Sequence, residues 1–271
     1  MDEAPQAMAP PSPFTAAVLR MAEDPLSVGG TSPGSRLVTD DKFLLWFAPP
    51  IYPGLSVVQR VRASDHDLAE AVERVRRLVA GDGRSRTEWM VGWSATPSDA
   101  SHRLLRLGLT ETEEPLTAMV ADRAPAEPPA GVEVRPVASA QDMVTFMRVQ
   151  HTAFGADEAT VKGSEEAARA HWEAQRSWDH AVRYLAFVDG EPAAAGQATF
   201  LPAGVQLNGG STVPHLRGRG AYRALVAARW QEAVRRGTPV LTTQARPAAR
   251  PILERLGFQP VGDIRMLADQ L

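Results

Sequence analysis

The residues best suited to chemistry lie in a glycine-rich turn between Val213 and Tyr222. The stretch reads Val-Pro-His-Leu-Arg-Gly-Arg-Gly-Ala-Tyr and connects a short apolar alternation to a helical pattern. A turn at a helix N-terminus offers unpaired backbone N–H groups, and the helix dipole adds partial positive charge. Gly218 and Gly220 let the backbone approach a bulky anion, while Arg217 and Arg219 can bind phosphate oxygens. The turn is therefore predicted to bind a diphosphate.

Two common phosphate-binding motifs do not fit this turn. A P-loop needs Gly-Lys followed by Ser or Thr, and the turn has no lysine. A dinucleotide-binding fold needs Gly-x-Gly-x-x-Gly with an acidic residue about twenty positions later, but Val240–Gln244 contains no carboxylate. The turn instead resembles the cofactor signature of the GNAT superfamily of N-acetyltransferases, Gln/Arg-x-x-Gly-x-Gly/Ala, which cradles the coenzyme A pyrophosphate.

The turn can be aligned with this signature in two ways, each with one departure. From His215, the sequence keeps Gly218 and Gly220 but has histidine where glutamine or arginine is usual. From Arg217, it keeps Gly220 but ends on Tyr222 instead of a small residue. A generic strand–turn–helix crossover with solvent-facing arginines is the alternative interpretation.

Elements after the turn strengthen the resemblance, which spans roughly Gly131 to Met266. The helix closes with Arg235-Arg236-Gly237, which places basic charge in the last turn before a glycine stop. A β-type run follows at Val240–Thr243, and Leu256-Gly-Phe258 after a short helix is similar to the end of the family's last helix.

The predicted elements also come in the GNAT order. Asp189-Gly190 is a two-residue hairpin signal between two strands. We therefore expect an α/β fold of the α+β type, with a mixed sheet. The expected elements before the glycine turn are a strand at 131–137, helices at 140–154 and 164–178, and hairpin strands at 183–188 and 192–200.

The upstream half resembles a decayed copy of the same unit. Arg106-Leu-Gly-Leu109 repeats the pattern of Arg255-Leu-Gly-Phe258, in each case after a strand and a short helix. The copy has no comparable glycine turn, so no second cofactor site is expected. Strands are predicted at 35–47, 56–61 and 89–93, with helices at 65–80 and 98–107.

The domain boundaries follow from this division and from a proline-rich linker. We expect a tail at 1–13, a degenerate GNAT-like domain at 14–122, a linker at 123–130 and a catalytic domain at 131–271. The chain has 271 residues, a length that favours two domains.

Composition excludes several functional classes. There is no cysteine, which removes disulfides, thiolate metal ligands and a cysteinyl-acyl intermediate. The net charge of −3 gives no electrostatic case for nucleic acid or anionic membrane. No run of eighteen apolar residues and no signal peptide is visible, so a cytoplasmic protein is expected. The spacing of His, Asp and Glu residues does not indicate a metal site. Whether the protein forms a homodimer is left open by the sequence.

The resemblance implies acetyl-CoA as cosubstrate and direct transfer of its acetyl group to a primary amine of a small molecule or peptide. A backbone N–H around Ser211–Val213, where two strands splay apart, would polarise the acyl carbonyl. The cofactor would contact Ser211, Thr212, Val213, Arg217, Gly218, Arg219, Gly220, Ala221 and Tyr222.

Catalytic side chains are less clearly marked. The family often has a tyrosine acid three residues before Leu-Gly-Phe, but that position is Leu253 here. Tyr222 is the alternative acid, although a tyrosine at a helix start also serves packing. His151 is the candidate base, although a lone helical histidine is also a structural residue. Asp157, Glu158 and His171 are further candidates for the base, and Trp172 and Trp178 are candidates for the acceptor-pocket wall.

The sequence thus predicts an N-acetyltransferase of the GNAT type, and two other functions stay open. A non-catalytic acyl-CoA sensor or scaffold is favoured by Leu253 and the lack of an obvious base. A nucleic-acid or phosphoprotein binder would use Arg217, Arg219, Arg223 and Arg229, but the net negative charge argues against it.

Overall fold

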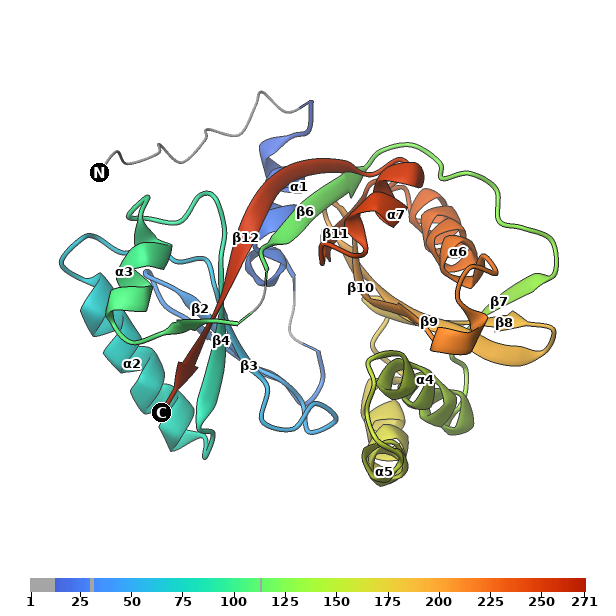
Figure 1. Cartoon of the computed structure of the whole chain (residues 1–271), viewed down its shortest axis with the longest axis horizontal. Coiled ribbons are helices and arrows are strands. Elements are labelled where there is room, and N and C mark those ends of the chain that lie inside the picture. The colour runs from blue at the N-terminus through green and yellow to red at the C-terminus, as the bar shows by residue number, and fades with distance from the viewer. Residues whose placement is uncertain (1–12, 30–31, 113) are drawn as a thin grey trace.

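The computed structural model describes residues 13–29, 32–112 and 114–271. Within these residues, twelve strands form one mixed sheet that runs through both halves of the molecule (Figure 1). The tail expected at 1–13 lies, apart from Pro13, outside the described residues. No helix of the described residues is long and apolar enough to cross a membrane.

The N-terminal half begins with a helix that periodicity did not reveal, α1. Thr15 caps it, because its hydroxyl accepts the Val18 N–H at 3.3 Å. The elements of this half are α1 (Ala16–Glu23), η1 (Pro25–Ser27), β1 (Arg36–Thr39), β2 (Leu44–Phe47), β3 (Ser56–Gln59), α2 (Leu68–Gly81), β4 (Arg86–Val91), α3 (Ala100–Arg106), β5 (Thr110–Glu111) and β6 (Leu116–Ala121).

In the C-terminal half, helices cover both faces of the sheet, with α4 and α5 on one side and α6 and α7 on the other (Figure 1). The elements of this half are β7 (Val132–Pro136), α4 (Ala140–Ala153), α5 (Glu158–Gln175), β8 (Ala181–Val188), β9 (Glu191–Leu201), β10 (Gly204–Thr212), η2 (Pro214–Leu216), α6 (Ala221–Arg235), β11 (Leu241–Ala245), α7 (Arg250–Arg255) and β12 (Gln259–Gln270).

Local chemistry explains where several of these elements begin. The β8–β9 hairpin turns at Asp189 and Gly190, whose φ angles are 51° and 82°, as a two-residue turn of the expected kind requires. Helix α5 starts six residues before the expected Ser164, because the Asp157 carboxylate caps it by accepting the Thr160 N–H at 2.8 Å.

The two halves exchange strands. The sheet order is β1-β2-β3-β4-β12-β6-β11-β10-β9-β8-β7, with β5 also paired to β12. Strand β6, from the N-terminal half, inserts between β11 and the first part of β12. The second part of β12 crosses to the N-terminal half and pairs with β4 and β5 (Figure 1). Each half therefore completes the sheet of the other.

The repeated Arg-Leu-Gly pattern occupies equivalent places in the two halves. In both, a short helix ends in a glycine with positive φ, +96° at Gly108 and +89° at Gly257. Leu109 N donates to Leu104 O at 3.2 Å, and Phe258 N donates to Leu253 O at 3.1 Å. Both sites form the same helix-closing motif, which leads into β5 after Gly108 and into β12 after Gly257.

Helix α1 packs over the centre of the shared sheet. Val18 and Ala22 belong to an apolar cluster contributed by β3, β4, β6 and β12. Two larger clusters lie around Phe146 and Leu225 and around Trp89, and each includes residues of an exchanged strand. The packing of α1 thus adds to the strand exchange in joining the halves.

Candidate active site

The glycine turn has the backbone geometry expected of an anion site. Gly218 and Gly220 have φ angles of 79° and 84°, which glycine adopts without steric cost. Helix α6 starts without a side-chain cap, and its first backbone hydrogen bond runs from Ala224 N to Gly220 O at 3.0 Å. The preceding amide N–H groups at the start of α6 therefore remain available as donors.

The two glycines of the turn serve different purposes. A side chain at Gly220 would overlap the ring of Pro129, which belongs to the linker between the halves. At Gly218, no heavy atom lies within 4 Å of the position that a Cβ would occupy. Gly220 therefore accommodates the linker, whereas Gly218 leaves space for a ligand.

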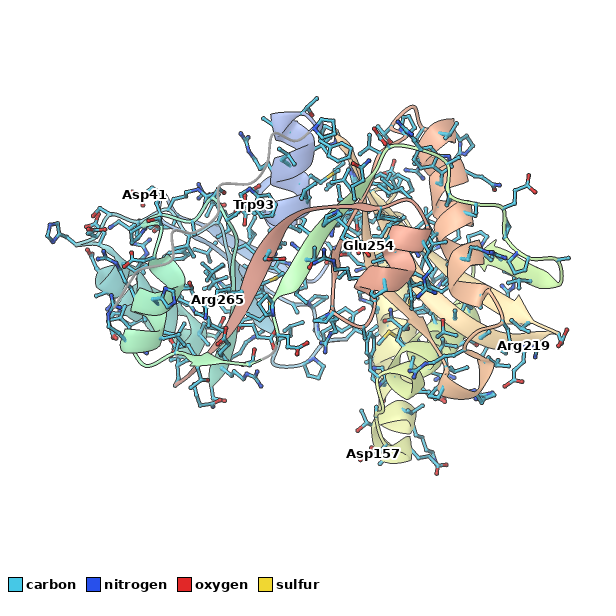
Figure 2. All side chains as sticks on the ribbon, turned by 45° about the horizontal axis from the view of Figure 1, so that its top comes forward. Asp41, Trp93, Asp157, Arg219, Glu254 and Arg265 are labelled. Carbon is cyan, nitrogen blue, oxygen red and sulfur yellow. The ribbon has the colours of Figure 1, made fainter. Side chains whose placement is uncertain are left out.

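The basic side chains of the turn are exposed and have protein partners. Arg219 Nη2 lies 2.5 Å from Asp189 Oδ2, at the outer rim of this half (Figure 2). Arg217 Nη2 donates to Ala153 O at 3.3 Å. His215 Nε2 lies 2.7 Å from Glu191 Oε1. Exposed ion pairs contribute little free energy, so a phosphate group can replace these partners.

Strands β10 and β11 diverge before the turn. They pair in parallel at Val205–Leu241 and Gln206–Thr242, although β10 continues to Thr212 and β11 to Ala245. On its other side, β10 shifts register against β9 between Asn208 and Ser211. The divergence and the bulge at Gly209-Gly210 leave backbone groups of β10 facing the gap between the strands.

The amide groups near this gap are only partly free. Val213 N donates to Ala193 O at 2.9 Å, so Val213 does not offer its N–H to an acyl carbonyl. Ser211 is buried, and its hydroxyl has no hydrogen-bond partner among the described residues. Gln150 Nε2 donates to Gly209 O at 2.8 Å and fixes the bulge from α4.

Tyr222 lies against the bulge from the opposite face. An added Cβ at Gly210 would be 2.7 Å from Tyr222 Cε2 and 3.4 Å from its hydroxyl oxygen. Burial raises the pKa of Tyr222, and the positive charge of Arg229 acts in the opposite direction. The phenol is therefore protonated at neutral pH and can act as a proton donor.

The other positions considered for the catalytic acid or base lie on elements other than α6, the helix of Tyr222. His151 is on the last turn of α4, where its Nδ1 is buried without a hydrogen-bond partner and burial lowers its pKa. His151 does not line the cavity described next. Leu253 is buried in the core, so no proton donor occupies that position. Asp157 caps α5 at the tip of the helix pair (Figure 2).

A cavity of about 440 Å³ lies between the two halves and reaches Asn208 and Gly209 of the bulge. Its apolar walls include Trp46, Phe146 and Trp178. His171 and Trp178, both named from the sequence, line the cavity, whereas Trp172 packs beside the core. Its polar lining also includes Gln59, Gln150, Gln175, Arg183, Gln197, Thr199, Gln206 and Gln244.

Several of these polar residues share one face of the sheet. Arg183, Gln197 and Asn208 are direct cross-strand partners on β8, β9 and β10. Tyr52 lines the cavity from the N-terminal half. Sequence reasoning did not single out Arg183 as a site residue. The available signal was an arginine within the otherwise apolar run Val182–Val188.

The corresponding gap in the N-terminal half is closed by the chain itself. Strands β3 and β4 also pair in parallel, at Val57–Glu88 and Val58–Trp89. Glu23, at the end of α1, accepts Ser94 N at 2.6 Å through Oε1. Asp24 accepts Arg60 N at 3.2 Å and forms an ion pair with Arg62 at 3.3 Å. These carboxylates occupy the region between the strands.

Comparisons with known proteins establish the fold. No family model and no curated protein matches the sequence. A GCN5-related N-acetyltransferase from Kribbella flavida is similar at 20% identity and a TM-score of 0.69, over 92% of this chain and 94% of that chain. A tandem GNAT protein from the clavulanic acid biosynthesis pathway is similar at 16% identity and a TM-score of 0.60, over 89% and 84%. A GCN5-related N-acetyltransferase from Sphaerobacter thermophilus is similar at 15% identity and a TM-score of 0.58, over 94% and 84%.

At these identities, the likeness concerns the fold. The chain has the GNAT fold, and its similarity to a tandem GNAT protein extends over most of its length. The expected α/β class with a mixed sheet is confirmed. The residue-level assignments and the domain boundaries remain predictions.

Proposed function

We propose that this protein is a GNAT-type N-acetyltransferase that transfers acetyl directly from acetyl-CoA to a primary amine. The observation that carries the proposal is the continuity of β10. This strand leads from the polar cavity, through the bulge at Gly209-Gly210, to the glycine turn. A diphosphate on the turn would thus be linked along the strand gap to an acceptor in the cavity.

The residues of the turn fit the diphosphate of coenzyme A. Open space at Gly218, free amides at the start of α6 and the exposed Arg217 and Arg219 provide donors and positive charge. Acetyl-CoA supplies a thioester that an amine can attack. The bulged segment of β10 can direct a backbone N–H at the carbonyl, and Tyr222 can protonate the leaving thiolate.

The acceptor amine must lose a proton before it attacks. An alkyl amine with a pKa of about 10 is mostly protonated at pH 7, and deprotonation costs about 4 kcal/mol. None of the cavity-lining residues that the structure describes carries a carboxylate, and the lining residue His171, whose pKa burial lowers to about 4, is a weak base. We therefore propose that water removes this proton, without a dedicated side-chain base.

The test is release of free coenzyme A thiol from acetyl-CoA upon addition of primary amines, with mass spectrometry of the product. Amine-dependent release with an acetylated product supports the proposal. Binding of acetyl-CoA without turnover across a panel that spans anionic, neutral and cationic amines would contradict it.

That second result would favour the alternative, a non-catalytic acyl-CoA sensor. The observation that favours a sensor is Leu253, which is buried where the family often has a tyrosine acid. A sensor would show thermal stabilisation by coenzyme A, and the Tyr222→Phe variant would retain it fully.

A further inference from the structure

The cavity beside the bulge has an unusual charge pattern for a site that receives an amine. Arg183 is the only lining residue with a permanent charge among those described, and seven lining residues are carboxamides. An acceptor with several ammonium groups would find no counter-charge there. The carboxamides are Gln59, Gln150, Gln175, Gln197, Gln206, Asn208 and Gln244.

Arg183 itself has no anionic partner. Among the described residues, it forms no ion pair, and its Nη2 contacts His171 Nε2 at 3.0 Å. Its Cζ lies 5.9 Å from the centre of the Phe146 ring, and Tyr52 faces it from the other half. Burial lowers the pKa of Arg183, but a guanidinium remains charged at neutral pH. A partly desolvated cation without a counter-charge is unfavourable, and a ligand anion would relieve this.

The neighbours of Arg183 can help to bind a ligand anion, but they carry no negative charge that would neutralise the guanidinium. Burial, with a further contribution from the positive charge of Arg183, lowers the pKa of His171 to about 4. His171 is therefore neutral at pH 7, and its Nε2 accepts from Arg183. Gln175, one turn further along α5, is 5% exposed, and both polar atoms of its side chain lack a hydrogen-bond partner. Its amide nitrogen offers a second donor beside the guanidinium.

The position of Arg183 relative to the bulge sets the shape of the ligand. Arg183, Gln197 and Asn208 are directly opposite one another on three adjacent strands. Neighbouring strands are about 4.8 Å apart, so the backbones of Arg183 and Asn208 are separated by about 10 Å. A ligand along this row would place one end at Arg183 and the other at the bulge of β10.

We infer that the acceptor is an amine with a carboxylate at its far end, which Arg183 binds while the amine lies at Asn208 and Gly209. This inference rests on the proposed function and specifies its substrate class. One guanidinium matches one carboxylate, with two parallel hydrogen bonds. The carboxamides between the two ends provide neutral polar contacts along the ligand.

The experiment uses four amines of equal chain length and acetyl-CoA. They are 6-aminohexanoate, 6-aminohexanamide, hexylamine and 1,6-diaminohexane. We expect kcat/KM to be highest for the carboxylate, at least about tenfold above the amide, which corresponds to about 1.4 kcal/mol. In Arg183→Gln, the ratio between carboxylate and amide should fall towards one. Arg148→Gln is the matched control, because Arg148 lies exposed on α4, pairs with Glu165 and does not line the cavity.

A binding measurement keeps the inference testable if Arg183→Gln fails to fold or turnover is absent. Hexanoate, which has no amine, should compete with hexylamine for binding to the cavity. Calorimetry should detect binding of 6-aminohexanoate to the wild-type protein in the presence of coenzyme A. Acetylation of hexylamine or the diamine as efficiently as 6-aminohexanoate would overturn this inference while the proposed function stands. Carboxylate binding without any acetylation would contradict the proposed function instead. Absence of both turnover and carboxylate binding would overturn the inference as well.

Discussion

Pro129 packs against Gly220, so closely that a side chain at position 220 would overlap its ring. The linker between the halves thus lies against the start of α6, beside the glycine turn. A substitution at Gly220 would disturb this packing as well as any ligand, and its effect on cofactor binding would have two explanations. Gly218 has the same type of backbone conformation without a neighbour, and so it provides the cleaner test.

We predict that Gly218→Ala weakens coenzyme A binding at least about tenfold, or about 1.4 kcal/mol, measured by calorimetry. The methyl group would stand in the space that the diphosphate needs. Gly237→Ala is the control, because Gly237 ends α6 with φ of +76° and also has nothing within 4 Å of its Cβ position. Both changes should lower the free energy of unfolding by about 1 to 2 kcal/mol. Equal coenzyme A affinities in the two variants would show that the turn has been misassigned.

Tyr222→Phe should lower kcat about 100-fold or more and leave KM for acetyl-CoA nearly unchanged, since a proton donor acts mainly in the transition state. The control is Tyr184→Phe. Tyr184 is also buried, and burial raises its pKa to about 12, but it lies on β8, two strands away from the bulged strand β10. A Tyr222→Phe enzyme with wild-type kcat would remove Tyr222 as the acid.

Features set by short segments were predictable from the sequence. The Asp189-Gly190 hairpin and the glycine turn depend on backbone angles that few residues adopt, and these residues can be recognised individually. Helix α5 begins earlier than the sequence pattern indicates, because its cap, Asp157, precedes a stretch with weak periodicity.

Features set by contacts between distant segments were not predictable. Nothing in the residues of β6 or β12 specifies which half they complete, because strand exchange preserves the same local pattern. The role of Arg183 depends on Gln197, Asn208 and His171, which come together only in the folded sheet. The same holds for Glu23 and Asp24, whose partners lie just after β4 and just after β3.

The pH dependence of acetylation should follow the pKa of the acceptor amine and not the pKa of a side chain of the enzyme. His171, with a pKa lowered to about 4, stays neutral above pH 5 and gives no inflection between pH 5 and 8. The midpoint of kcat/KM should therefore lie near pH 10 for an alkyl amine and near pH 8 for an α-amino group, following their pKa values of about 10 and 8. Steady-state rates from pH 5 to about 11 with both amines provide the measurement. A common inflection near pH 6 would indicate a side-chain base instead, and His151→Ala would then be the next variant to measure.

Asp24 should make the folded protein less stable as pH rises from about 4 to about 6. Burial, and next the negative charge of Glu23, raise the pKa of Asp24 to about 6 from its ordinary value of 3.8. Within this window, the native state binds more protons than the unfolded state, so the free energy of unfolding falls with increasing pH. The contribution is about 2 to 3 kcal/mol, at about 1.4 kcal/mol per pKa unit.

Asp24→Asn removes this titration, so its unfolding free energy relative to wild type should rise between pH 4 and pH 7 in urea denaturation. Asp82→Asn is the control of opposite sign. A hydrogen bond from Arg36 lowers the pKa of Asp82, and this carboxylate stabilises the fold above its ordinary titration range. Parallel pH profiles for wild type and Asp24→Asn would contradict the assignment.

The strand exchange predicts that neither half folds alone. A fragment of residues 131–271 lacks β6, whose residues Ala118, Met119 and Val120 are fully buried between β11 and β12. A fragment of residues 1–130 lacks β12, so β4 keeps only β3 as a neighbour and β5 loses its partner. Each fragment expressed singly should show no cooperative thermal transition by circular dichroism, whereas co-expression should restore one. Cleavage of the intact protein at a protease site between Ala126 and Glu127 should leave a folded complex, because it breaks the linker but keeps every strand. A cooperative transition in the isolated 131–271 fragment would show instead that the exchanged strand is dispensable and that the expected boundary at residue 131 separates independent domains.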